Sequence, residues 1–332
     1  MSDNPFKRPA SRAGIRDPRN ATFISSLKDI EQGRHRQKQL SAHTSILRLE
    51  DLEEVADLPA DEPLGQAPAP AMVASKMVAF FGPKGGMGTT TLAINVAGTI
   101  ARLARQAVII DMDLQLGSVP VSLNVKPERS IAELVIEAVN SGSGPLESGL
   151  DRHASGLTMI AQGDRIEELS SVTTDRLPRF FDAVGQMFSH VIVDGLRDFS
   201  DHAVAVMDIA HMVVLVVTQD VPAVRAAARS LRLFRRLGYG PERLKIVVNR
   251  YHKKAPVTLE AIGNALGQAV HAVVRNDFPL VEEALNCGVM VHELKSGSGV
   301  ARDLDALARN LAGLQESRGG GRSFLGRIFK RE

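Results

Sequence analysis

One stretch of sequence decides the fold: Phe80-Phe81-Gly82-Pro83-Lys84-Gly85-Gly86-Met87-Gly88-Thr89-Thr90-Thr91. An apolar run, 77–81, predicts a buried strand before the glycines, and an apolar-periodic segment, 92–103, predicts a helix after them. Glycines between a strand and a helix let backbone N–H groups approach an anion, and the helix N-terminus adds a favourable dipole. The stretch therefore predicts a cradle for phosphate.

The cradle matches the ordinary P-loop pattern only in part. That pattern has a glycine, four residues, and then Gly-Lys-Ser/Thr. Thr89 stands where the phosphate-binding lysine belongs, while a lysine occurs upstream as Lys84. A dinucleotide fingerprint fits less well, because Thr91 replaces its third glycine, although Asp111 lies at about the right distance for a ribose contact. A glycine turn that binds nothing is the remaining alternative.

The stretch resembles the deviant Walker A motif of the ParA/MinD superfamily, Lys-Gly-Gly-x-Gly-Lys-Thr/Ser-Thr. The matching positions are Lys84, Gly85, Gly86, Gly88, Thr90 and Thr91. Thr89 departs from the motif, and a threonine there is a habit of one branch, the CpaE/TadZ proteins of type IV (Flp/Tad) pilus assembly. The Leu-Gln-Leu-Gly run at 114–117 and the Asn-Arg-Tyr run at 249–251 also favour this branch. Leu196 departs from it, since relatives tend to have proline there.

Bulk composition sets limits on the class of protein. The chain has 332 residues, 44% of them hydrophobic, and a formal net charge of +2, so the molecule as a whole carries no strong nucleic-acid signature. The single cysteine, Cys287, excludes a disulfide framework and suggests a reducing compartment. No run reaches the roughly 18 apolar residues of a membrane span. We therefore expect a cytoplasmic protein.

Strand and helix patterns alternate from Met77 onwards, which predicts parallel βαβ units. The expected strands are 77–81, 108–110, 157–161, 191–194, 212–217, 244–248 and 270–274. The expected helices are 92–103, 131–139, 174–187, 222–237, 280–286 and 299–314. The sequence thus predicts an α/β fold with a doubly wound, mostly parallel sheet and helices on both faces. The resemblance identifies it as a P-loop NTPase of the MinD/ParA type.

The chain divides into a tail, a domain and a second tail. Residues 1–74 are polar, first basic and then acidic, and end in a Pro/Ala linker, so we expect a disordered or partner-binding tail. It is too short and too polar for the receiver-like domain that many CpaE/TadZ proteins carry. Residues 75–316 form the expected ATPase domain. Residues 317–332 form a glycine hinge and a short basic amphipathic tail.

Carboxylates follow two of the expected strands. Asp111 and Asp113 follow the strand 108–110, and Asp194 ends the strand 191–194 in a Walker B pattern. Parallel sheets bind ligands at the carboxyl ends of their strands, so both Asp111 and Asp113 should face the phosphate cradle. The Walker B carboxylate holds Mg²⁺, usually through water.

The resemblance implies ATP and Mg²⁺ as cofactors. It implies two catalytic residues: Lys84, which would reach across a sandwich dimer to the partner's nucleotide, and Asp113, which would orient the attacking water. Thr90 and Asp194 would ligate the metal. The implied nucleotide-binding residues are Lys84, Gly85, Gly86, Met87, Gly88, Thr89, Thr90, Thr91, Asn249, Arg250, Asp277 and Pro279. Among them Asn249 would read adenine, with a turn or cap role as the alternative, and Asp277 and Pro279 would lie in the loop that covers the base.

Loss of the intrachain lysine at position 89 predicts weak binding and slow hydrolysis, so the chain is at most a slow ATPase. The leading hypothesis is an ATP-gated homodimer that positions Flp/Tad pilus or secretion machinery. The alternatives are a ParA-type DNA segregation ATPase and a MinD-like ATPase that positions division or the flagellum.

Two basic segments, the helix 222–237 and the C-terminal tail, concern the choice of binding partner. Arginines at 225, 229, 232, 235 and 236 decorate the helix 222–237, either as a DNA-binding stripe or as a solvated face; nucleic acid is the less favoured partner. The C-terminal tail presents one apolar face and resembles the membrane-targeting tail of MinD, with a disordered end or partner-docking peptide as the alternative. Its apolar residues are Phe324, Leu325, Ile328 and Phe329. On the membrane reading the protein lies peripherally at the inner membrane or the cell pole.

Overall fold

The computed structural model describes residues 75–104, 106–141, 146 and 149–314. The expected N-terminal tail, 1–74, and the expected hinge and amphipathic tail, 317–332, lie outside these residues. The same holds for the tail positions Phe324, Leu325, Ile328 and Phe329. The described chain therefore tests the predicted fold and the predicted nucleotide site, but neither tail.

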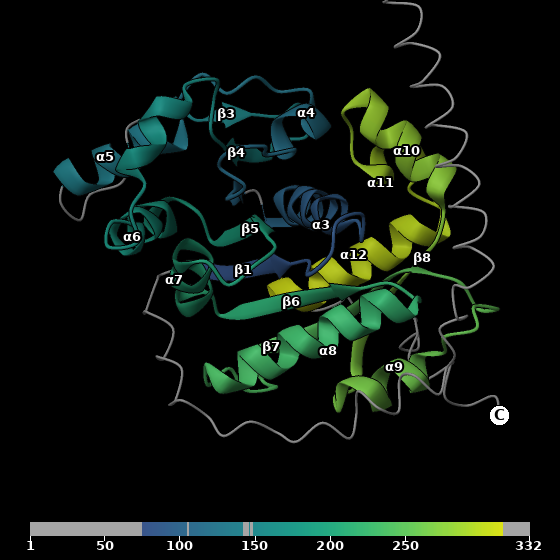
Figure 1. The fold of residues 1–332 in the computed structure, drawn as a ribbon. Helices are drawn as coiled ribbons and strands as arrows, with labels where there is room; N and C mark the ends of the chain where they lie inside the picture. The colour runs from purple at the N-terminus through teal and green to yellow at the C-terminus, as the bar shows by residue number, and fades with distance from the viewer. Residues whose placement is uncertain (1–74, 105, 142–145, 147–148, 315–332) are drawn as a thin grey trace, which may run out of the picture. The chain divides into compact units, whose positions relative to one another are not determined.

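The described strands form an eight-stranded sheet in the order β3-β4-β2-β5-β1-β6-β7-β8 (Figure 1). The strands are β1 (Lys76–Phe81), β2 (Ala107–Asp111), β3 (Asp151–Arg152), β4 (Thr158–Ile160), β5 (His190–Leu196), β6 (Met212–Val217), β7 (Leu244–Tyr251) and β8 (Val270–Arg275). All neighbouring strands pair in parallel except β3 with β4. The predicted α/β class with a mostly parallel sheet is confirmed.

The helices cover the two faces of the sheet. They are α3 (Thr89–Ala104), α4 (Val119–Leu123), α5 (Ile131–Asn140), α6 (Leu177–Met187), α7 (Asp201–Ile209), α8 (Val221–Arg236), α9 (Leu259–Leu266), α10 (Phe278–Cys287), α11 (Val291–Lys295) and α12 (Gly299–Ala312), with a 3₁₀ turn, η2 (Ile166–Ser171). Helix α3 packs over β1, β2 and β5 and against α12, while α7 contacts β1 and α8 contacts β6. Right-handed crossovers place α3 and α8 on opposite faces, because the chain moves from β1 to β2 in one direction and from β6 to β7 in the other.

Burial of the central strands explains their apolar sequences. In β1 the run Met77–Phe81 is buried throughout, and β6 is buried from Val213 to Val217. Strands covered by helices on both faces lack the alternation of a half-exposed strand. The glycine stretch begins at the carboxyl end of β1, so it is anchored to this buried core.

Two predicted boundaries were wrong in a way that affects the site. Strand β7 continues to Tyr251, three residues beyond the expected end at 248, so Asn249 and Arg250 belong to the strand. Helix α10 begins at Phe278, so Pro279 lies in its first turn and not in a loop. Proline suits that position, because the first helical N–H groups need no partner within the helix.

The short helices α4, α7, α9 and α11 and the turn η2 were not predicted. Their signals lie mainly at their ends: Thr258 caps α9 by accepting a hydrogen bond from the Ala261 N–H, and Gly267 ends that helix with φ 59°. A helix of two turns gives an apolar period too little length to be recognised. Among the described helices, none combines the length and the hydropathy needed to cross a bilayer.

Candidate nucleotide site

The glycine stretch forms an open loop between β1 and α3. Gly86 and Gly88 have φ of 82° and 79°, a left-handed conformation that glycine adopts without strain. A Cβ atom built on Gly85 or Gly86 would contact nothing, whereas one on Gly82 would overlap the Thr89 hydroxyl. Successive N–H groups in such a loop form an anion-binding nest at the start of a helix. The loop has the form that the sequence predicts.

A hydroxyl and a carboxylate meet beneath this loop. Thr90 Oγ1 donates to Asp194 Oδ2 at 2.6 Å, and Ser118 Oγ donates to Thr90 Oγ1 at 3.3 Å. Asp194 Oδ1 is buried and has no hydrogen-bond partner in the described chain. Burial raises the pKa of Asp194 to about 7; the Thr90 hydrogen bond opposes the rise and the neighbouring Asp111 carboxylate adds to it.

This pair fits a bound Mg²⁺ ion. Magnesium takes oxygen ligands and usually keeps several waters and substrate phosphates, so it needs few protein groups. The described residues contain no cluster of three or more His, Cys, Asp or Glu side chains that could hold a metal by themselves. A cation at Thr90 and Asp194 would also give the unpaired Asp194 Oδ1 a counter-charge, directly or through water.

Asp111 has a different role from the one expected. Its Oδ1 accepts from the Asp113 N–H at 3.0 Å and its Oδ2 accepts from the Val119 N–H at 3.0 Å, and the side chain is buried. Burial raises its pKa to about 6. The expectation that Asp111 faces the cradle was wrong, because both of its oxygens bind the backbone of the loop that follows β2.

Asp113 is held by a second loop. It forms an ion pair with Arg197, and its Oδ1 also accepts from the Leu116 N–H at 3.3 Å. Gly195 has φ of 90°, and a Cβ on it would overlap the backbone N of Asp113. The loops after β2 and β5 therefore touch at Asp113, and the glycine permits that approach.

Lys84 lies at the edge of the loop, half exposed, with Nζ 3.5 Å from Oδ1 of Asp220. Both residues line a cavity of about 320 Å³ together with Gly85, Gly86 and Arg250. Asp220 also accepts from the Ala223 N–H at 2.9 Å as the N-cap of α8. Lys84 thus has a carboxylate partner within its own chain.

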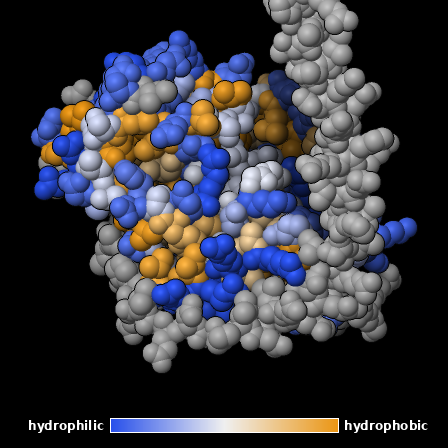
Figure 2. Space-filling view, in the orientation of Figure 1, coloured by the Kyte–Doolittle hydropathy of each residue, from blue (hydrophilic) through white to orange (hydrophobic). Residues whose placement is uncertain are grey.

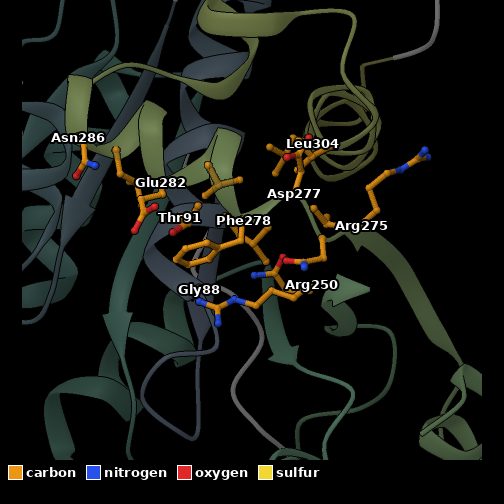
Figure 3. A pocket seen from close by; sticks show the side chains of 16 residues that line it. Gly88, Thr91, Arg250, Arg275, Asp277, Phe278, Glu282, Asn286 and Leu304 are labelled. Carbon is orange, nitrogen blue, oxygen red and sulfur yellow. The ribbon is translucent and has the colours of Figure 1, made fainter. Parts of the chain in front are cut away.

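A second cavity, of about 200 Å³, lies between the loop and the ends of β7 and β8 (Figure 3). Asn249 reaches it from a buried position and donates through Nδ2 to the Met87 carbonyl at 2.8 Å. Figure 3 shows Phe278 and Asp277 at the cavity with Thr91 and Gly88. Of the residues expected at the base, Asn249 and Asp277 line this cavity and Pro279 is not among its lining residues; Arg250, expected to bind nucleotide, lines it as well.

Several residues of the site were not predicted: Ser118, Asp220 and Phe278. Two of them carry a sequence signal. Ser118 and Asp220 each stand two positions before a proline, which is the pattern of a helix N-cap. Phe278 itself was not singled out, because an aromatic residue after a strand reads equally well as core, although Asp277 before it and Pro279 after it form the same N-cap pattern.

Comparisons with known proteins give consistent matches. The sequence model of the CobQ/CobB/MinD/ParA nucleotide binding domain matches residues 78–286. The septum site-determining protein MinD of Thermotoga maritima is 24% identical over 238 residues, which are 69% of this chain and 85% of that protein.

Solved structures share the fold. A ParA family ATPase from Chlorobium tepidum superposes with a TM-score of 0.64 at 18% identity, covering 71% of this chain and 98% of that one. MinD from Pyrococcus horikoshii, solved with Mg-ADP, superposes with a TM-score of 0.60 at 17% identity, covering 78% of this chain and all of that one (100%). At these identities the likeness shows the fold alone.

Proposed function

Because this chain belongs to the CobQ/CobB/MinD/ParA nucleotide-binding family, we propose that it binds ATP with Mg²⁺ and acts as a dimerising localisation factor. We assign it to the CpaE/TadZ type, which serves Flp/Tad pilus assembly. The observation that carries the nucleotide assignment is the Thr90–Asp194 pair, with its unpaired buried oxygen, beneath an open glycine nest.

The residues of the site divide the work of holding the nucleotide. The N–H groups of Gly85, Gly86 and Gly88 would bind the phosphates, and Thr90 with Asp194 would hold the metal. Mg²⁺, when bound, neutralises charge on the β- and γ-phosphates. Asn249 and Asp277 lie at the cavity that would take the base.

Thr89 supports a localisation role over an energy-consuming one. The hydroxyl at this position packs against Gly82 and brings no positive charge to the loop. An ATPase without that charge loses transition-state stabilisation and turns over slowly. A slow ATPase is suited to mark a place in the cell for as long as its nucleotide lasts.

Dimerisation rests on Lys84. In the single chain this lysine is paired with Asp220 at the mouth of the 320 Å³ cavity. The pair is about half exposed and therefore weak, so Lys84 can leave Asp220 for a partner's phosphates. The expected partners are a second copy of the chain and pilus or secretion proteins, at the cytoplasmic side of the inner membrane or at the pole.

Sizing of the full-length protein by light scattering tests this proposal. We expect ATP with Mg²⁺ to convert monomer into dimer, ADP to leave it monomeric, and Lys84→Ala to bind ATP without dimerising. Lys126→Ala, an exposed lysine away from the loop, is the matched control. A wild type that binds ATP and stays monomeric contradicts the dimer switch.

A DNA segregation ATPase is the second candidate, because α8 carries five arginines at 225, 229, 232, 235 and 236. A solvated helix face is the alternative to a DNA-binding stripe. Arg235 donates to the Leu266 carbonyl at 3.0 Å, and Arg225 and Arg236 also have partners. Retention of the ATP-bound protein on DNA at low salt, lost in Arg229→Gln with Arg232→Gln, would favour segregation over pilus assembly.

A further inference from the structure

The nucleotide site lacks the usual intrachain cation. Thr89 replaces the lysine, and three other basic side chains near the site have acidic partners. Lys84 pairs with Asp220, Arg197 with Asp113, and Arg275 with Asp303. A triphosphate bound by the loop of a single subunit would therefore need a cation from another part of the fold to neutralise its negative charge.

Arg250 has an uncommon backbone conformation. Its φ is 52°, in the left-handed region that residues with a side chain rarely adopt. The pairing of β7 with β8 shifts here, because Val248 opposes Val273 while Tyr251 opposes Arg275. Strand β7 thus carries one extra residue, a β-bulge. Bulges beside binding sites re-aim a side chain, and strain of this kind clusters at such sites.

The bulge aims Arg250 at the glycine loop. The side chain lines both the 200 Å³ cavity and the 320 Å³ cavity, so it stands between the place for the base and the mouth at Lys84. Its Nε lies 3.9 Å from the point that a Cβ on Gly88 would occupy. Figure 3 shows the guanidinium group beside Gly88. Within the described residues no hydrogen bond or ion pair engages this guanidinium group.

We propose that Arg250 is the intrachain cation that binds the nucleotide phosphates in place of the lysine missing at position 89. The inference rests on the proposed ATP binding. A guanidinium group offers paired N–H donors that match phosphate oxygens, and an exposed, unpaired one loses no existing contact when it binds. The strained bulge brings that group to the loop.

The test is the affinity of the full-length protein for ATP and for adenosine, measured by calorimetry with Mg²⁺. Arg250→Asn removes the charge and keeps a residue that tolerates the left-handed conformation. We expect ATP affinity to fall about tenfold or more, while adenosine affinity changes less than about twofold, since the lost contact is to phosphate. Arg250→Lys should recover part of the loss. Lys253→Ala, an exposed cation that lines neither cavity, is the charge control.

A double variant makes the test specific. Thr89→Lys in the Arg250→Asn background should restore ATP affinity, and it should gain less in the wild-type background, because the two cations serve the same phosphates. Equal losses for ATP and adenosine, or no loss of ATP affinity, overturn the role of Arg250. A wild type that binds no ATP overturns the proposed function itself, so the two failures are distinguishable.

Discussion

Asp194 is a buried carboxylate whose environment favours the protonated form in the nucleotide-free protein. Its pKa is raised to about 7, chiefly by burial. In an unfolded chain an aspartate has a pKa near 4, so between about pH 4 and 7 the folded chain holds a proton that the unfolded chain has lost. The stabilisation of the folded chain by this extra proton is therefore fully present below about pH 4. The free energy of unfolding falls as the pH rises from about 4, and this stabilisation is lost once the pH has passed 7.

We predict that Asp194→Asn stabilises the nucleotide-free protein at pH 8 by about 1–3 kcal/mol and removes Mg²⁺-dependent ATP binding. The amide cannot ionise, so no charge is buried. Urea unfolding at pH 5 and pH 8 measures the effect, and the difference between variant and wild type should grow with pH. Asp182→Asn, an exposed aspartate, is the control. A difference independent of pH would show that Asp194 is already ionised without cost.

Arg250 and Asp194 illustrate a trade between stability and function. One holds a strained backbone and the other an unsatisfied buried oxygen. Each departs from what local stability favours, and both lie at the glycine loop. Such departures are expected where a ligand supplies the missing interaction.

Helix α8 begins at a cap that also holds Lys84. Asp220 Oδ1 accepts from the Ala223 N–H at 2.9 Å, and Thr218 Oγ1 donates to Asp220 Oδ2 at 2.6 Å. The Lys84 Nζ lies 3.5 Å from Asp220 Oδ1. One carboxylate thus links the start of a helix to the residue on which dimerisation is proposed to depend.

We predict that the two functions of Asp220 separate in a pair of variants. Asp220→Ala should lower the free energy of unfolding by about 1 kcal/mol, because the cap is lost. Asp220→Asn keeps a cap and should change it by less than about 0.5 kcal/mol, since an exposed ion pair contributes little. Both release Lys84 and should strengthen the ATP-dependent dimer. Urea unfolding and sizing give the two readouts, and an unchanged dimer in both variants would mean that Asp220 does not compete for Lys84.

The whole chain joins a nucleotide domain to two segments whose roles rest on sequence. Figure 2 shows that hydrophobic patches on one face of the described domain are interrupted by hydrophilic residues. The proposed membrane contact rests on the amphipathic pattern of the C-terminal sequence, which lies outside the described residues.

We predict that ending the chain at Gly321 reduces pelleting with anionic vesicles. One short amphipathic helix binds lipid only marginally, so binding by full-length protein should increase with ATP, when a dimer presents two tails. Co-sedimentation with and without ATP measures this, and a Phe324→Ser, Phe329→Ser variant keeps the tail's charge as a control. Equal pelleting of full-length and shortened protein would remove the membrane role.

The glycine loop, the parallel sheet and most of the strands could be predicted from the sequence. The loop depends on residues adjacent in the chain, and the strands β1 and β6 are apolar because helices cover both of their faces. The short helices were not predicted. The predicted end of β7 was too early, because the bulge at Arg250 depends on how β7 pairs with β8. The contacts of Asp111 were not predicted, because its oxygens accept from the Asp113 and Val119 N–H groups and the path of the loop after β2 decides where those groups lie.

By itself the sequence determined that a strand, a glycine nest and a helix follow one another, with a threonine in place of the usual lysine. These are local facts, set by conformational preference and by hydrophobic period. Only the tertiary structure decided which side chains meet there. Thr90 and Asp194 stand 104 residues apart and share a 2.6 Å hydrogen bond, and Arg250 reaches Gly88 from a different strand. Such meetings depend on the order of strands in the sheet, because that order brings distant strand ends to one edge.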